Sequence, residues 1–157
     1  MTARGFLFAS AYNKVQTVCS YQGLRLKPLY ALDLTASAAE AFVPSSEGEP
    51  ALLAMNVTIS TGGVTREELR VFAMNSEGDL RPVYTEEAPD RIGGLLFHPS
   101  GRFLYAVDRA SRLRAYAVDS DGRLELTMSI EHAGGSMAIT LKDARVQEVT
   151  RSLEAES

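Results

Sequence analysis

The stretch that decides the fold is residues 92–131, which read IGGLLFHPSGRFLYAVDRASRLRAYAVDSDGRLELTMSIE. Short apolar runs alternate in it with turn residues, and no run keeps the period of a helix. The pattern predicts strands at residues 95–97, 103–107, 113–118 and 124–130. Proline and glycine fall between these strands, where tight turns need them. Four consecutive antiparallel strands in about forty residues are typical of one β-propeller blade.

A second copy of this pattern lies 44 residues earlier in the chain, so that residue 69 corresponds to residue 113. Residues 69–80 read LRVFAMNSEGDL, and residues 113–124 read LRAYAVDSDGRL. The two segments share the Leu-Arg pair, an alanine, the serine, the glycine and the last leucine. Gly78 and Gly122 stand where a hairpin needs a left-handed backbone. Agreement in both strand pattern and turn residues predicts repeated propeller blades.

The segment before the second copy is harder to interpret. Residues 41–45 and 51–56 align with the first two strands of the 92–131 repeat, so strands are expected there. A helix through residues 36–41 is the alternative, because alanine and glutamate favour helices. Residues 57–67 contain a Gly-Gly pair and are predicted to form a loop.

We therefore expect an all-β protein made of antiparallel propeller blades, with an α-helix at its carboxyl end. Residues 1–140 are predicted to form an incomplete propeller, with blades at about 5–32, 38–88 and 90–131 and the start of another at 134–140. The first blade is predicted to lack its innermost strand. Residues 141–157 are predicted to form a helical tail, since four apolar residues lie on one helical stripe: Leu141, Val146, Val149 and Leu153.

The composition argues against several classes of function. The chain has 157 residues, 45% of them apolar, and a net charge of −4. Its basic residues do not cluster, so no nucleic-acid surface is expected, and no apolar stretch is long enough to predict a membrane span. Cys19 is the only cysteine, which excludes an intrachain disulfide and favours a cytoplasmic location. His98 and His132 are the only histidines and have no neighbour at a metal-ligand spacing, so no metal or other cofactor is expected.

Two segments carry a family resemblance. FHPSGRFLYAVDR at residues 97–109, followed by YAVDSDGRL at residues 116–124, resembles a blade of the lactonase-type seven-bladed propellers. That family includes the propeller 6-phosphogluconolactonases and the carboxymuconate cyclases. The resemblance covers about a quarter of the chain and argues for the fold more strongly than for an enzyme.

This resemblance implies a lactonase or cycloisomerase acting on an anionic lactone or a muconate-type small molecule. A full propeller of this family is more than twice as long, so the chain is expected to be a fragment of such an enzyme. The alternative is a non-catalytic propeller remnant, or a binding or scaffold module. In this family, catalysis resembles general acid/base chemistry, and the residues that carry it come from several blades.

Asp108 and Arg109 are the best chemical candidates, because they end the second strand of the clearest blade. In a propeller they would lie at the rim of the central funnel, where ligands bind. A guanidinium recognises carboxylates and phosphates by paired hydrogen bonds and can stabilise a developing oxyanion. Asn56 aligns with Asp108 and is a third candidate for binding substrate. The alternative for Asp108 is a salt bridge between blades, with an arginine.

The two histidines receive different predictions. His132 lies in a connection between blades on the funnel side and is a second catalytic candidate, beside Arg109. His98 lies in the Pro-Ser-Gly turn and is expected to make a local hydrogen bond. The expected partners are a small anionic molecule and a second copy of the chain. Two copies could exchange residues 135–140 and close a ring of about six blades.

Overall fold

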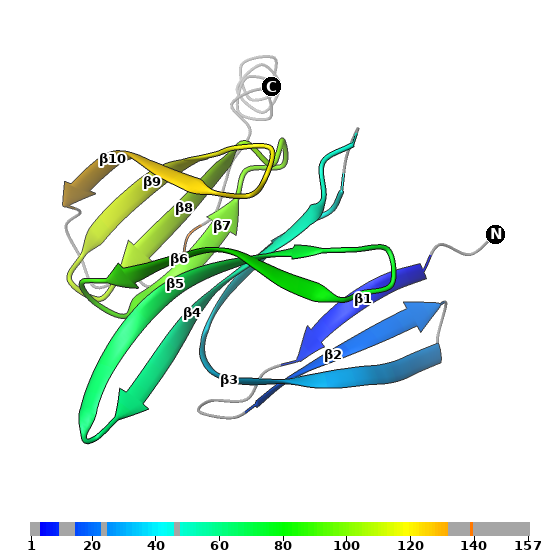
Figure 1. The fold of residues 1–157 in the computed structure, drawn as a ribbon. Coiled ribbons are helices and arrows are strands. Elements are labelled where there is room, and N and C mark those ends of the chain that lie inside the picture. Colours follow the sequence, from blue (N-terminus) through cyan, green and yellow to red (C-terminus); the bar gives the residue numbers. More distant parts are fainter. Residues whose placement is uncertain (1–3, 10–14, 23–24, 46–47, 132–138, 140–157) are drawn as a thin grey trace, which may run out of the picture.

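The computed structural model describes residues 4–9, 15–22, 25–45, 48–131 and 139, and these form an all-β structure (Figure 1). Six strands make one sheet in the order β1-β2-β3-β4-β5-β6, and four make a second in the order β10-β9-β8-β7. Neighbouring strands among the described residues pair antiparallel, which confirms the predicted fold class. The predicted helix at residues 141–157 lies outside the described residues. The strands are β1 (Arg4–Ala9), β2 (Val15–Gln22), β3 (Arg25–Val43), β4 (Ala51–Thr61), β5 (Val64–Met74), β6 (Leu80–Ala88), β7 (Ile92–Phe97), β8 (Phe103–Asp108), β9 (Arg112–Val118) and β10 (Leu124–Glu131).

Strand β3 is long because it serves two blades. Its first part pairs with β2, and its last residues, from Ala36 to Val43, pair with β4. Blade 1 therefore consists of β1, β2 and the start of β3, blade 2 of the end of β3 with β4, β5 and β6, and blade 3 of β7 to β10. The alternative of a helix through residues 36–41 is wrong. Helix propensity is a weak preference, and the ladder to β4 outweighs it.

The predicted loop at residues 57–67 is also wrong, because β4 and β5 continue through it as a hairpin. Gly62 and Gly63 form the two-residue turn with φ angles of 58° and 81°. Positive φ at both central residues is what a type I′ hairpin turn requires, and Gly-Gly supplies it. The flanking strands are rich in β-branched residues, which favour extended backbone.

The 44-residue repeat holds at the level of single hydrogen bonds. Asn75 Oδ1 accepts the backbone N–H groups of Glu77 and Asp79, and Asp119 Oδ1 accepts those of Asp121 and Arg123. Each of the three acceptor and donor residues in the first turn is 44 positions before its counterpart. A β-bulge falls at residue 83 in β6 and at residue 127 in β10, again 44 apart. The turn glycines Gly78 and Gly122 have φ angles of 92° and 85°, as predicted.

The ladder register corrects one sequence alignment. Leu53 pairs with Phe72, and Leu104 pairs with Tyr116. Phe72 and Tyr116 are equivalent in the 44-residue repeat, so Leu53 corresponds to Leu104, an offset of 51 residues. The alignment of 51–56 with 103–108 used an offset of 52 and is wrong by one. Since successive strand residues point to opposite faces, Asn56 and Asp108 lie on opposite faces of their blades.

The main hydrophobic core lies between blades 2 and 3. Blade 2 contributes Leu52, Ala54 and Val71, and blade 3 contributes Phe97 and Leu104, all of them buried. A second cluster on the other face of blade 2 consists of Leu53, Met55, Val57 and Phe72. Figure 1 shows the sheet of blade 3 beside β6 and β5 of blade 2. Within the described residues there is no helix with the length and hydropathy of a membrane span.

Candidate functional site

Asp108 is buried at the end of β8, where it contacts two arginines of the neighbouring strand. Its Oδ2 atom lies 3.7 Å from Arg114 Nη2 and 3.8 Å from Arg112 Nε. Its Oδ1 atom accepts the backbone N–H of Arg112 at 3.0 Å. The carboxylate of Asp108 therefore closes the turn between β8 and β9 and compensates the charge of a buried guanidinium.

This turn presents Arg109. The N–H of Ser111 is bonded to the carbonyl of Asp108 at 3.2 Å, and Ser111 has a φ of 60°. A left-handed backbone costs energy in a non-glycine residue, so the Asp108 contacts hold this turn in a strained shape. The Arg109 side chain is exposed, and the backbone N–H of Arg109 donates to the carbonyl of Arg91 at 3.0 Å. The turn at 109–111 is thereby fixed to the crossover at 89–91, which leads from blade 2 into blade 3.

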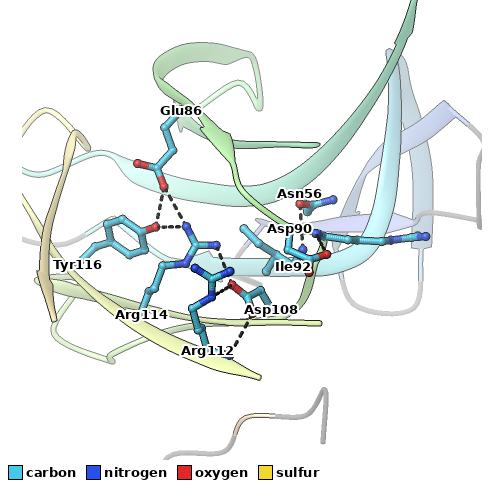
Figure 2. Close-up of polar contacts among 9 residues, drawn as sticks. Asn56, Glu86, Asp90, Ile92, Asp108, Arg112, Arg114 and Tyr116 are labelled. Carbon is cyan, nitrogen blue, oxygen red and sulfur yellow. Dashed lines mark hydrogen bonds and ion pairs between the residues drawn. The ribbon is translucent and has the colours of Figure 1, made fainter. Parts of the chain in front are cut away.

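Arg114 connects Asp108 to the neighbouring blade, as Figure 2 shows. Its Nη1–H donates to Tyr116 Oη at 2.9 Å, and Tyr116 O–H donates to Glu86 Oε1 at 2.6 Å. Glu86 lies on β6 of blade 2, and its Oε2 atom accepts the hydroxyl of Tyr84 at 2.8 Å. We call these five residues, Asp108, Arg114, Tyr116, Glu86 and Tyr84, the interblade cluster.

The electrostatics of the interblade cluster favour neutral phenols. Burial is the largest cause that raises the pKa of Tyr84 from 10.0 to about 12, and its hydrogen bond to Glu86 is the second. The same two causes raise the pKa of Tyr116 further. The side chain of Arg114 is only 7% exposed, and that of Asp108 is fully buried. Among the described residues, Arg114 Nε, Arg114 Nη2 and Asp108 Oδ2 are buried without a hydrogen bond. Attraction between charges therefore stabilises the pair of Asp108 and Arg114 more than hydrogen bonding does.

Asn56 lies on the other side of the same junction and is fully buried. Its Oδ1 atom accepts the N–H of Ile92, the first residue of β7, at 3.3 Å. Its amide group donates to Glu67, which also accepts the hydroxyl of Thr58. Figure 2 shows Asn56 next to Ile92 and apart from the interblade cluster. The Oδ1 end of the Asn56 amide thus holds the first residue of β7 against blade 2, while its N–H end is bonded within blade 2.

Comparisons with known proteins support the fold. No protein-family profile matches the chain, and no curated protein matches it significantly in sequence. A crystal structure from Bacteroides fragilis NCTC 9343, of a protein assigned as a 6-phosphogluconolactonase, matches with a TM-score of 0.65 and 14% identity. The match covers 84% of this chain and 37% of that chain. The chain has part of a lactonase-type propeller fold.

A second solved structure with this fold is that of a protein from Lactobacillus plantarum. It matches with a TM-score of 0.59 and 14% identity, over 85% of this chain and 38% of that chain. The present chain therefore spans less than two fifths of the length of either protein. At this level of identity, the likeness concerns the lactonase-type propeller fold and not the residues of a site.

The lactonase-type fold brings some of the sequence-predicted site residues together. Asp108 and Arg109 lie in one turn, but Asp108 pairs with Arg112 and Arg114, and its contact to blade 2 runs through Arg114 to Glu86. Asn56 lies in the same blade junction, inside the protein. His132 lies outside the described residues, so its catalytic role stays a prediction. The substrate-binding roles of Asn56, Asp108 and Arg109 also stay predictions.

His98 makes the local contacts that its turn predicts. Its Nδ1 atom is 2.7 Å from Ser100 Oγ and accepts the backbone N–H of Ser100 at 3.1 Å. The turn closes with the N–H of Gly101 bonded to the carbonyl of His98, and Gly101 has a φ of 74°. Among the described residues, no three histidine, cysteine, aspartate or glutamate side chains gather as metal ligands would.

Sequence reasoning missed Arg114, Tyr116, Glu86 and Tyr84. One signal was present, because the Leu-Arg pair recurs at 69–70 and 113–114 and is followed in both strands by four apolar residues. An arginine at such a position must be paired if it is buried. Arg70 is indeed paired with Glu68 at 2.7 Å, just as Arg114 is paired with Asp108 and Glu86. The identity of the partners could not be read, since Glu86 is 28 positions from Arg114 in another blade.

Proposed function

We propose that this chain takes part in the binding and opening of a small anionic lactone, with Arg109 as the contact to the anion. The family resemblance of residues 97–109 and the lactonase-type fold support this substrate class. A ring-closing reaction on a muconate-type acid is the related alternative, and it would use the same anion contact.

The observation that carries the proposal is the exposed Arg109 on a turn fixed by a buried aspartate. A flexible lysine or arginine on a loose loop loses conformational entropy when it binds an anion. Arg109 stands on a turn held by Asp108, by the strained Ser111 and by the bond to the Arg91 carbonyl. The backbone of Arg109 is therefore held at a defined place, at the end of the blade where β8 stops and β7 begins.

The chemistry proposed for Arg109 is charge recognition. In lactone hydrolysis, water adds to the ring carbonyl, the ring C–O bond breaks, and a carboxylate, a hydroxyl and one proton are formed. The guanidinium would bind the phosphate or carboxylate of the substrate, or the oxygen that becomes negative when water adds. Asp108 would act as a positioning residue, since its oxygens contact Arg112, Arg114 and the turn.

A non-catalytic propeller module is the second candidate. The burial of Asn56 and Asp108 favours it, because both side chains are already committed to contacts within the protein. Such a module would keep the arginine pairs of the blades for stability alone.

Hydrolysis of 6-phosphogluconolactone by the full chain tests the proposal, with proton release as the readout and spontaneous hydrolysis as the reference. We expect acceleration, and we expect Arg109→Ala to lower kcat/KM by roughly 100-fold, as for the loss of one oxyanion donor. Arg123→Ala is the matched control, since Arg123 is an exposed arginine in the β9–β10 turn at the other end of the blade. A folded chain that neither accelerates the reaction nor binds 6-phosphogluconate by calorimetry would support the non-catalytic candidate.

A further inference from the structure

The β4–β5 hairpin of blade 2 is longer than the equivalent β8–β9 hairpin of blade 3. The register and the 44-residue repeat make Leu53 equivalent to Leu104 and Leu69 equivalent to Leu113. The two leucines are 16 positions apart in blade 2 and nine apart in blade 3, so blade 2 has seven extra residues here. In repeat proteins, an insertion in one repeat falls in a loop, and such loops often form the binding face.

The extra residues form a projecting arm. β3 pairs with β4 only as far as Val57, and β6 pairs with β5 only from Glu67. Beyond these two residues, β4 and β5 pair only with each other among the described residues, up to the Gly-Gly turn. Figure 1 shows this hairpin extending beyond β6. We call residues 58–67 the arm.

The two faces of the arm differ in chemistry. Successive residues of a strand point to opposite faces, and directly paired residues point to the same face. One face of the arm carries only polar side chains: Thr58, Ser60, Thr65 and Glu67. This polar face continues from Asn56, which bonds to β7 of blade 3. The opposite face contains Ile59, which packs against the second apolar cluster of blade 2. The polar face is therefore the one on the side of blade 3.

The polar face keeps hydrogen-bonding capacity for a ligand. Ser60 Oγ and Thr65 Oγ1 lie 3.2 Å apart, and both residues are exposed. One bond shared between two hydroxyls leaves one O–H donor and lone pairs on both oxygens. The carboxylate of Glu67 is half-buried and accepts hydrogen bonds from Asn56 and Thr58, which orient it. Hydroxyls beside an oriented carboxylate suit the hydroxyl groups of a sugar.

A short chain of contacts connects the arm with Arg109. Glu67 accepts from the amide of Asn56, whose oxygen accepts the N–H of Ile92. The residue before Ile92 is Arg91, whose carbonyl accepts the backbone N–H of Arg109. The polar face of the arm and Arg109 therefore lie at the same end of blades 2 and 3, on either side of the crossover between them.

We propose that the polar face of the arm binds the hydroxyl groups of a sugar-derived lactone whose anionic group is held by Arg109. This inference rests on the proposed function and narrows its substrate class. A sugar lactone carries hydroxyl groups that can pair with Ser60, Thr65 and Glu67, whereas a muconate-type acid carries none. The negative charge of Glu67 also disfavours a substrate with a second carboxylate near the arm.

Thr65 and Thr61 provide a matched pair of variants. Thr65 pairs with Ser60 on the polar face, and Thr61 pairs with Val64 on the opposite face. Both threonines are exposed and lie near the same Gly-Gly turn. Valine has the shape of threonine without the hydroxyl and also favours strands, so neither change should disturb the hairpin. Only Thr65→Val removes a hydroxyl from the proposed binding surface.

Calorimetric titration of the full chain with two phosphate esters tests the inference. Glucose 6-phosphate carries the hydroxyl groups of a sugar ring, whereas hexyl phosphate has the same phosphate group and number of carbons without them. We expect Thr65→Val to raise the dissociation constant of glucose 6-phosphate about five-fold, as for the loss of one neutral hydrogen bond. Thr61→Val should leave it unchanged, and neither variant should change the affinity for hexyl phosphate.

Arg109→Ala distinguishes this inference from the proposed function, because it should weaken the binding of both esters. Circular dichroism checks that all variants keep the β-structure. If the wild type binds the two esters equally, or if Thr65→Val and Thr61→Val act alike, the inference about the arm is overturned while the anion contact of Arg109 stands. A folded wild type that binds neither ester overturns both.

Discussion

Blades 2 and 3 share their strand pattern, their turn contacts and the position of their bulge, yet they differ in what surrounds them. Blade 2 has buried clusters on both faces, with Leu53 and Met55 on one side and Leu52 and Ala54 on the other. Blade 3 buries mainly the face toward blade 2, while on the other face Val107 is buried but Met128 is 57% exposed. The difference shows that an alternating apolar strand predicts two faces suited to burial, but the neighbouring blade decides whether they are buried.

A second difference lies in the β4–β5 hairpin of blade 2 and the β8–β9 hairpin of blade 3. In blade 2, β4 and β5 run on to a Gly-Gly turn, whereas in blade 3 the chain turns back at residues 109–111. The short turn leaves Arg109 exposed beside the crossover between blades. A chemical site at this end of the molecule is therefore more accessible on blade 3 than beneath the long hairpin of blade 2.

The largest expected effect concerns the equivalent arginines Arg114 and Arg70. We expect Arg114→Ala to destabilise the protein by about 3–5 kcal/mol, because it leaves the fully buried Asp108 without its main charge partner. Arg70→Ala should cost only about 1–2 kcal/mol, within the usual range for single changes. The Arg70 side chain is 23% exposed, and its partner Glu68 keeps Arg66 at 3.0 Å. Urea unfolding of both variants measures the difference, and equal losses would show that the two blades use their arginines alike.

The next effect concerns the glycines of the turns. A Cβ added at Gly122 would lie 2.7 Å from Leu52 Cδ2 and 3.1 Å from Val83 Cγ2, both in blade 2. A Cβ at Gly101 would meet only Val43 Cγ2, at an ordinary 3.8 Å. We expect Gly122→Val to cost about 2–4 kcal/mol, from strain at positive φ together with overpacking. Gly101→Val should cost less, because only the backbone strain applies.

The control for this comparison is Arg123→Ala, which changes an exposed side chain in the same turn as Gly122. It should alter the free energy of unfolding by no more than about 0.5 kcal/mol. Melting temperatures of the three variants give the order directly. If Gly101→Val were as harmful as Gly122→Val, the close contact between the β9–β10 turn and blade 2 would be refuted.

The smallest effect concerns Tyr116, whose equivalent in blade 2 is Phe72. Tyr116→Phe removes the hydroxyl that bridges Arg114 and Glu86, and we expect a loss of about 1 kcal/mol at neutral pH. The pKa values of Tyr116 and Tyr84 are raised in the folded chain, so the folded state holds these protons more tightly than the unfolded state. Their stabilising contribution is complete below about pH 10 and is lost as the pH rises from there toward 12 and beyond.

The pH dependence separates the phenol from simple packing. The free energy of unfolding should fall less steeply above about pH 10 in Tyr116→Phe than in the wild type. Glu86→Gln should also flatten the curve, because the hydrogen bond to Glu86 contributes to both raised pKa values. Parallel curves for all three proteins would mean that these tyrosines do not titrate as the interblade cluster requires.

Much of the fold could be read from local features of the sequence. The 44-residue repeat was visible because the turn residues follow each strand at a fixed distance, and the side chains of Asn75 and Asp119 cap those turns locally. Two errors had physical causes. Residues 36–41 favour a helix in isolation but are held by a ladder to β4, and residues 57–67 form a hairpin because the neighbouring strand satisfies their backbone.

The candidate site was less predictable than the fold. Arg109 could be singled out because it follows a strand in a recognisable segment. The one-residue difference between offsets of 51 and 52 could not be seen, since both faces of β4 carry apolar residues of similar size. That difference turns Asn56 toward blade 3 and Asp108 toward blade 2, and so separates residues that the alignment had made equivalent.

The strand positions outside residues 36–41 and 57–67, the turn glycines and the all-β class thus followed from the order of residues alone, because strand alternation and turn geometry depend on neighbours along the chain. Tertiary structure was needed for the pairing of Arg114 with Asp108 and Glu86, for the fixed turn beneath Arg109, and for the exposed face of blade 3. These features depend on residues from different strands and blades. Their contacts arise only when the sheets pack, and a shift of a single residue in register would change every one of them.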